Sequence, residues 1–251
     1  MTLVTPIIRI LLVSLACWMF TAPVSLAATM PAVQVTFIDA ESEEPIANAN
    51  VIFFAESKEG TFTGDGGSYA NLFLVEGVTN EAGVINFPAQ SFWPMPFLLN
   101  SNNHMPSMYM YKYGYELAGL YSLGPYPAST NAIISWAKRY TQPIKVKKTR
   151  TTLGLFELVD SAGSVAERSY LNKIDHCAWK KIPKFLLAIE SGAIEWKSRP
   201  KEEGWYKQAK TYSREPRNPV ADLILSEGNE RRLFNCGKPS DFFETFRHPE
   251  Q

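Results

Sequence analysis

The chain has 251 residues, with 25 basic and 25 acidic side chains; 45% of the residues are hydrophobic and 20% are charged. These proportions are those of soluble globular domains, so they argue against a disordered chain and against a polytopic membrane protein. A chain without net positive charge is also not the pattern of a basic nucleic-acid-binding protein, and we expect no nucleic-acid partner.

Residues 1–27 have the pattern of a cleavable export signal. Arg9 precedes a mostly apolar run at 10–20, and a small-residue exit, Ser-Leu-Ala, ends at Ala27. We therefore expect cleavage before Ala28, which leaves 24 basic against 25 acidic residues. No later segment approaches the ~18 consecutive apolar residues of a spanning helix. The mature protein is accordingly expected in the periplasm or secreted, without a transmembrane segment.

Two alternatives to this processing stay open. Cys17 could be lipidated, which would make the protein a lipid-anchored envelope protein. The residues before it match a lipoprotein box only loosely, because Ser14 stands where leucine is usual, and the apolar run continues past the cysteine. An uncleaved anchor helix is the other alternative, and the small-residue exit before Ala28 argues against it.

The segment from 28 to 150 is predicted to consist of β-strands. Apolar residues alternate with polar ones from Val33 to Phe37, the period of a half-buried strand. Further β-rich runs occupy 49–55, 72–78, 84–88, 108–116 and 143–148. Gly83 ends a turn between two of these runs and is expected to adopt the positive φ that closes a hairpin. About seven short strands without intervening helical patterns indicate an antiparallel β-sandwich.

Three motifs follow one another in this segment: residues 44–51 (EPIANANV), residues 78–83 (VTNEAG) and residues 110–116 (MYKYGYE). Together they resemble a carboxypeptidase regulatory-like domain over residues 33–148. The resemblance implies a transthyretin-like (prealbumin-like) β-sandwich that is a non-catalytic appendage. Tyr113 departs from the family pattern, in which proline usually precedes Gly-Tyr. The whole chain is similar to a group of exported bacterial proteins that has no assigned activity.

The pattern becomes helical after the last predicted strand. Ser164 and Glu167 form a capping-box pattern, so we expect a helix to begin there. Pro183 is expected either to kink this helix or to begin the next one. Apolar spacing over 185–196 continues the helical period, and a short helix is expected at 219–225 after Asn218.

These helices need a surface on which to pack, because short helices are marginally stable alone. The simplest partner is one face of the sandwich, which predicts an α+β architecture. The composition changes near Arg150. We therefore divide the chain into a signal peptide at 1–27, a β-sandwich at 28–150 and a helical C-terminal extension at 151–251.

Removal of the signal leaves two cysteines, Cys177 and Cys236. In an oxidising compartment the expected state is a disulfide. Closing a loop of this length stabilises by roughly 4 kcal/mol in the chain-entropy model. The alternative recruits His176 and His248 into a metal site with both thiolates. No closely spaced ligand pair such as Cys-x-x-Cys occurs, so we expect neither a metal nor a cofactor.

The histidines give no catalytic pattern. None of His104, His176 and His248 stands in the His-x-x-Glu pattern of a zinc carboxypeptidase, and no Gly-x-Ser-x-Gly occurs. The chain also lacks the Tyr-Arg-Gly-Ser tail of the transthyretin-like hydroxyisourate hydrolases. We predict no catalytic residue. Because a glycosidase places its two carboxylates by fold rather than by spacing, a hydrolase with a cleft between sandwich and helices stays the alternative.

Tyr109, Tyr111, Tyr113 and Tyr115 occupy alternate positions and share one face if the segment is extended. An exposed row of phenol rings could stack on sugars or dock a protein. Alternatively, the tyrosines lie beneath the C-terminal helices. These four residues are the candidate ligand-binding residues.

The basic run at 138–150 has two interpretations. It could contact an anionic glycan or a phospholipid head group, or its lysines could form the solvent face of a strand. Taken together, the sequence predicts an exported, non-catalytic β-sandwich module of the cell envelope. It would act by binding a protein or glycan of the envelope, or as a structural part.

Overall fold

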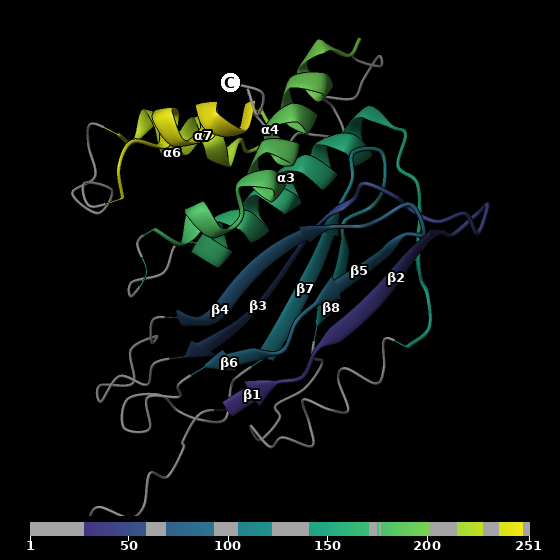
Figure 1. The fold of residues 1–251 in the computed structure, drawn as a ribbon. Coiled ribbons are helices and arrows are strands. Elements are labelled where there is room, and N and C mark those ends of the chain that lie inside the picture. The colour runs from purple at the N-terminus through teal and green to yellow at the C-terminus, as the bar shows by residue number, and fades with distance from the viewer. Residues whose placement is uncertain are drawn as a thin grey trace, which may run out of the picture.

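The computed structural model describes residues 28–58, 69–92, 105–121, 141–170, 175, 177–200, 215–227 and 236–247. The predicted signal segment 1–27, with Cys17, and the histidines His104, His176 and His248 lie outside these residues. The described chain is an α+β fold in which a group of helices lies on one side of the β-sheets (Figure 1).

The strands form one four-stranded, one three-stranded and one two-stranded sheet. Their bounds are β1 (Ala28–Met30), β2 (Val33–Asp39), β3 (Asn50–Lys58), β4 (Tyr69–Val78), β5 (Val84–Phe87), β6 (Gln90–Phe92), β7 (Met105–Tyr111), β8 (Ala118–Tyr121) and β9 (Ile144–Val146). The order is β4-β3-β7-β8 in the larger sheet, β5-β2-β9 in the smaller, and β1 pairs with β6.

Among the described strands the pairing is antiparallel except for one pair, which the sequence analysis did not predict. β9 runs parallel to β2, with Phe37 opposite Ile144 and Asp39 opposite Val146. The two strands lie far apart in the chain, so no hairpin fixes their relative direction. The predicted turn before β5 is confirmed: Gly83 has a φ of 69°. A Cβ atom at this glycine would lie 2.4 Å from the carbonyl oxygen of Phe37.

The two larger sheets share one apolar core. Val35 and Phe37 of β2 and Phe87 of β5 pack against Phe53 of β3 and Met108 of β7, all of them buried. The ring centroids of Phe53 and Phe87 are 5.4 Å apart. Side chains alternate along these strands, so one face of each sheet supplies this core.

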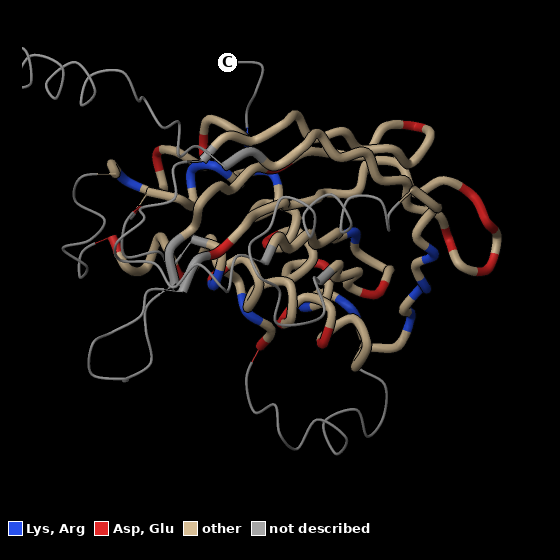
Figure 2. Tube along the Cα trace, turned by 90° about the horizontal axis from the view of Figure 1, so that it is seen from below, with Lys and Arg blue, Asp and Glu red and all other residues tan. Residues whose placement is uncertain are grey.

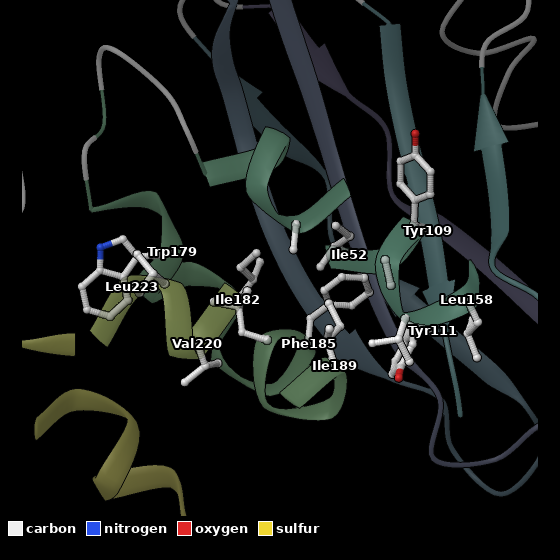
Figure 3. Close-up of a cluster of buried hydrophobic side chains, with 14 of the residues drawn as sticks. Ile52, Tyr109, Tyr111, Leu158, Trp179, Ile182, Phe185, Ile189, Val220 and Leu223 are labelled. Carbon is white, nitrogen blue, oxygen red and sulfur yellow. The ribbon is translucent and has the colours of Figure 1, made fainter. Parts of the chain in front are cut away.

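The opposite face of the four-stranded sheet is covered by the helical layer. This layer consists of α3 (Thr152–Tyr170), the 3₁₀ helix η2 (Ala178–Lys181), α4 (Pro183–Ser198), α6 (Pro219–Leu225) and α7 (Pro239–Arg247). Ile52 and Tyr111 of the sheet share a second apolar core with the α4 residues Phe185 and Ile189. Figure 3 shows Phe185 and Ile189 between Ile182 and Tyr111. The helices thus pack on one face of the sheet, as predicted.

The predicted start of the first helix was wrong. α3 begins at Thr152, twelve residues before Ser164. The Ser164 hydroxyl lies inside the helix and donates to the carbonyl oxygen of Asp160 at 2.9 Å. Glu167, the other half of the apparent capping box, accepts instead from Arg217. Ala178 belongs to the separate 3₁₀ helix η2. None of the described helices is long and apolar enough to cross a membrane.

The start of α4 is fixed by the sheet. Pro183 begins this helix, one of the two predicted alternatives, and Ile182 before it offers no capping side chain. The Glu76 carboxylate of β4 accepts instead from the amides of Lys184 (3.1 Å) and Phe185 (2.9 Å). Burial raises the Glu76 pKa above its ordinary value, and these two amides and the Lys184 charge offset only part of that effect.

The short helix α6 agrees with the prediction at both ends. It spans Pro219–Leu225, and the Asn218 side chain accepts from the amide of Ala221 at 3.2 Å. Asparagine before a proline at the first helical position is a local start signal, so it can be found in the sequence without knowledge of the tertiary contacts.

Helix α4 packs closely against β7 and the residues after it at Gly192. A Cβ atom at this position would lie 2.0 Å from the hydroxyl oxygen of Tyr111 and 3.0 Å from Cδ2 of Tyr113. Any side chain at this position would push the helix away from β7. Glycine in a helix interior is otherwise unfavourable, so close packing explains its presence here.

We predict that Gly192→Ala lowers the free energy of unfolding by about 1–3 kcal/mol, although alanine normally favours a helix. In a Tyr111→Phe background the loss should be smaller, since the clashing oxygen is gone. Ser191→Ala, an exposed neighbour on the same helix, is the control and should have little effect. Urea unfolding measures all four variants; equal losses from Gly192→Ala in both backgrounds would contradict the proposed contact.

Candidate functional site

The four candidate tyrosines do not form one exposed row. Tyr109 and Tyr111 lie on the helix-facing side of β7 and are buried. The strand ends at Tyr111, Tyr113 is partly buried against the same core, and Gly114 turns the chain with a φ of 89°. Tyr115 therefore packs against the core between the sheets. Tyr109 and Tyr111 therefore agree with the alternative interpretation, in which the tyrosines lie beneath the helices.

The hydroxyl groups of Tyr111 and Tyr113 are buried without a hydrogen-bond partner among the described residues. Tyr111 is only 1% exposed. Burial raises the pKa of Tyr111 well above its ordinary value, and the nearby Tyr113 and Glu195 raise it further. Tyr113 also has a raised pKa because of burial, although the Arg199 guanidinium, 5.6 Å from its ring centroid, lowers it in part. Both phenols are therefore neutral at ordinary pH and are poor proton donors.

Tyr115 belongs to a polar network around Asp39 at the end of β2. The Asp39 side chain is buried, and its Oδ1 accepts from the amides of Glu41 (2.8 Å) and Ser42 (3.0 Å). Its Oδ2 lies 3.1 Å from the Tyr115 hydroxyl, which donates to it, and 2.6 Å from Lys148 Nζ. The Lys148 contact is the main cause of an Asp39 pKa far below its ordinary value, with the Ser42 and Glu41 amides next. A carboxylate with every oxygen engaged is suited to fixing structure rather than to accepting a proton.

The basic run near β9 is largely paired with the acidic turn after β2. Besides the Lys148–Asp39 pair, Lys145 pairs with Glu43, and Arg150 lies 3.8 Å from Glu41. Figure 2 shows basic and acidic residues interspersed along the described trace. The described part of the run therefore offers little unpaired positive charge for an anionic surface.

Cys177 and Cys236, the two cysteines among the described residues, are joined. Cys177 and Cys236 form a disulfide with an S–S distance of 2.00 Å. Cys177 precedes η2 and Cys236 precedes α7, so the bond ties the C-terminal helix to the layer. With both sulfur atoms used, neither is available as a thiolate ligand for the metal site that was the alternative. Among the described residues no group of His, Cys, Asp or Glu could hold a metal ion.

A pocket of about 500 Å³ lies in the helical layer, between the C-terminal half of α4 and α6. Its apolar lining includes Ile194 and Pro216, and its polar lining includes Lys197, Glu215 and Arg217. This volume is in the range of small-molecule sites, roughly 300–1,000 Å³. The pocket lies within the helical layer. The alternative hypothesis of a hydrolase requires a cleft at a different place, between the sandwich and the helices.

The sequence analysis did not identify this pocket, because its walls come from segments that are separated in the chain. Arg217 ties one of these segments to α3. Its backbone amide donates to Asp160 Oδ1 (3.2 Å), and its Nη1 lies 2.5 Å from Glu167 Oε2. Lys197 pairs with Glu215 across the two walls at 2.9 Å. The arrangement offers hydrogen-bond donors beside an apolar surface, which suits binding of a ligand.

No protein-family model, curated protein or solved structure matches the chain. The interpretation of the site therefore depends on the geometry of this chain alone.

We predict that Tyr111→Phe leaves the free energy of unfolding unchanged or raises it by up to about 1 kcal/mol, because the deleted hydroxyl is buried and unpaired. Tyr115→Phe is the matched comparison. It removes a hydroxyl that donates to Asp39, so it should destabilise by about 1–2 kcal/mol. Urea unfolding of both variants tests the pair. A larger loss from Tyr111→Phe than from Tyr115→Phe would show that the Tyr111 hydroxyl has a partner.

Asp39→Asn should lower the stability of the protein at neutral pH, and the melting temperature should fall by several degrees. The folded-state pKa of Asp39 lies below the unfolded value of 3.8. Its contribution is therefore complete above the unfolded pKa and is lost as the pH falls through the folded pKa. The difference between wild type and variant should shrink as the pH falls below about 4. Unfolding measured across this range tests the sign.

Glu41→Gln serves as the control for this series, because the Glu41–Arg150 pair is exposed and such pairs contribute little. A constant difference between wild type and Asp39→Asn at every pH would contradict a depressed pKa for Asp39.

Proposed function

We propose that the protein is an exported, non-catalytic module of the cell envelope that acts by binding through its helical layer. The scaffold in this proposal is an antiparallel β-sandwich of the prealbumin type. The shared core of the three- and four-stranded sheets supports a sandwich, while the parallel β2–β9 pair is an addition to the antiparallel plan.

Contacts among the three motifs support the resemblance to a carboxypeptidase regulatory-like domain. The Thr79 hydroxyl, in the second motif, accepts from the amide of Ala49 (2.8 Å) and donates to the carbonyl oxygen of Ile46 (2.7 Å), both in the first. Lys112 of the third motif donates to the carbonyl oxygen of Ala47 at 2.6 Å. Motifs distant in the sequence thus meet at one end of the sheets, as expected if they together specify one domain type.

The compartment is proposed from the disulfide and the predicted signal. Disulfides persist in oxidising compartments and are rare in the cytosol, so the Cys177–Cys236 bond agrees with cleavage before Ala28 and a periplasmic or secreted mature protein. The proposed partner is a protein or glycan of the cell envelope.

The observation that carries the binding proposal is the pocket between α4 and α6. Ile194, in its lining, has a relative exposure of 62%. Mature protein would be immobilised and used to isolate partners from envelope extracts. A partner retained by Leu225→Asp but lost by Ile194→Asp supports binding at the pocket, because Leu225 is also exposed (76%) but does not line it. Identical partners with both variants would contradict it.

Processing makes a separate prediction. When the full chain is produced in a bacterial host, the mature protein should begin at Ala28, lie outside the cytoplasm and weigh two daltons less than its dithiol form. Intact-mass spectrometry after fractionation measures all three. A lipid-modified Cys17 would replace the signal-peptidase product by a lipoprotein, and a cytoplasmic chain that retains residues 1–27 would contradict export.

Removing the disulfide should destabilise the protein. Cys177→Ser with Cys236→Ser frees a closed loop with a sequence separation of 59, and we expect a loss of about 2–4 kcal/mol. Wild type unfolded in the presence of a reductant should lose a similar amount, while the double variant should not respond to the reductant. Equal stability of the reduced and oxidised wild type would contradict this role.

A further inference from the structure

The C-terminal helix α7 contacts both of the helices that form the pocket. Arg247 of α7 binds the Glu190 carboxylate of α4, with its Nη2 atom 2.7 and 2.8 Å from the two carboxylate oxygens. On the other side, the amide of Ser240 at the start of α7 donates to the carboxylate of Glu227, two residues after the end of α6. Helix α7 therefore connects α4 to the C-terminal end of α6.

The contacts from α3 hold a different part of the same wall. Asp160 of α3 accepts from the amide of Arg217, which precedes α6. Helix α6 has only seven residues, and a helix of this length depends on its contacts because nucleation is costly. Its far end is held by the buried side chain of Leu223 and by the contact between Glu227 and α7.

Aromatic packing holds α7 against the rest of the layer. Phe243 has no exposed surface, and its ring centroid lies 5.6 Å from that of Trp179. Phe242 packs edge-on against the same indole, with the centroids 5.0 Å apart. Trp179 belongs to η2 and lies two residues after Cys177. Helix α7 therefore packs on the short helix to which the disulfide ties it.

The disulfide is the covalent part of this attachment. Cys177 precedes η2, and Cys236 lies three residues before the start of α7. Helix α7 has nine residues and is not stable apart from its contacts. Without the bond, only noncovalent contacts keep α7 in place, and a segment at the end of the chain opens at a lower free energy than the whole fold. We therefore expect α7 to leave the layer first when the bond is broken.

The two cysteines differ in access to a reductant. Cys177 is partly exposed, whereas Cys236 is only 2% exposed. We therefore expect a thiolate of a dithiol reductant to attack Cys177 Sγ. The bond between the cysteines breaks, and its electron pair leaves on Cys236 Sγ, which takes up a proton. The second thiol of the reductant then displaces Cys177 as a thiol, so two electrons have passed to the protein and the reductant has become a disulfide.

We propose that the Cys177–Cys236 disulfide is a redox switch for the pocket between α4 and α6. The oxidised protein keeps α7 packed and thereby holds the two walls together. Reduction by a dithiol releases α7 and loosens the C-terminal end of α6. This inference depends on the proposed binding function and adds its regulation, because full binding then requires the oxidised protein.

The test compares amide hydrogen exchange in the oxidised mature protein and in the same protein reduced with dithiothreitol. Labelling times are kept short enough for β3 to stay protected in both states. At these times the amides of α7 should exchange at least about tenfold faster after reduction, followed by those of the last turn of α6, while α3 stays protected. The double variant Cys177→Ser with Cys236→Ser should exchange like the reduced wild type and should not respond to dithiothreitol.

A second variant weakens the attachment of α7 without changing the disulfide. Arg247→Gln removes the ion pair with Glu190, so α7 should stay protected in the oxidised protein and exchange faster than in wild type after reduction. Arg150→Gln is the matched control, because it removes an exposed ion pair with Glu41 on the sandwich. It should leave the exchange of α7 unchanged in both states.

Either of two results would overturn the proposal. The first is equal exchange of α7 in the oxidised and reduced protein. The second is loss of protection in α7 and β3 at the same labelling time after reduction, which would mean that α7 does not open separately from the fold.

Partner binding separates this proposal from the binding function. If an envelope partner that Ile194→Asp loses is bound equally by the oxidised and reduced protein, redox control is wrong and the binding function stands. If Ile194→Asp retains every partner while α7 still responds to reduction, the binding function is wrong and control of the pocket is wrong with it. Only the redox-dependent packing of α7 would then remain.

Discussion

The four-stranded sheet has no face that can be left to water, and this constraint determines the rest of the architecture. Along β3, Val51 and Phe53 are buried against the smaller sheet, while Ile52 and Phe54 are buried on the helix side. The smaller sheet covers one face and the helices must cover the other. The helices in turn depend on the sheet: α4 takes its N-terminal cap from Glu76 and packs closely only because position 192 is glycine.

Strands with local sequence signals were predicted well. The ends of elements that depend on contacts between residues distant in the sequence were predicted wrongly. The continuous apolar run at 49–55 was identified as a strand, and Gly83 was identified as the residue that closes a hairpin. The alternation of tyrosines also indicated a common face, which holds for Tyr109 and Tyr111. It fails at Tyr115, because the chain turns at Gly114 and the Asp39 carboxylate holds the Tyr115 hydroxyl on another side.

The helices show the same division between local and distant causes. The Asn218-Pro219 start of α6 is encoded in adjacent residues and was predicted correctly. The start of α3 was missed, because Ser164 and Glu167 imitate a capping box while the buried side chains of Leu155 and Val159 extend the helix toward its true N-terminus. The pocket could not be predicted at all, since α4 and α6 meet only in the folded chain.

Both walls of the pocket are held in place by contacts outside it. On α4, Trp196 Nε1 donates to the carbonyl oxygen of Thr152 at 3.0 Å, which fixes the helix against the start of α3. On the other wall, the amide of Arg217 donates to Asp160 of the same helix. Because α3 thereby positions both walls, a ligand would not have to order them on binding, and less binding free energy would be lost to conformational entropy. A site of modest size with few polar contacts needs such preorganisation if it is to bind a small ligand at all.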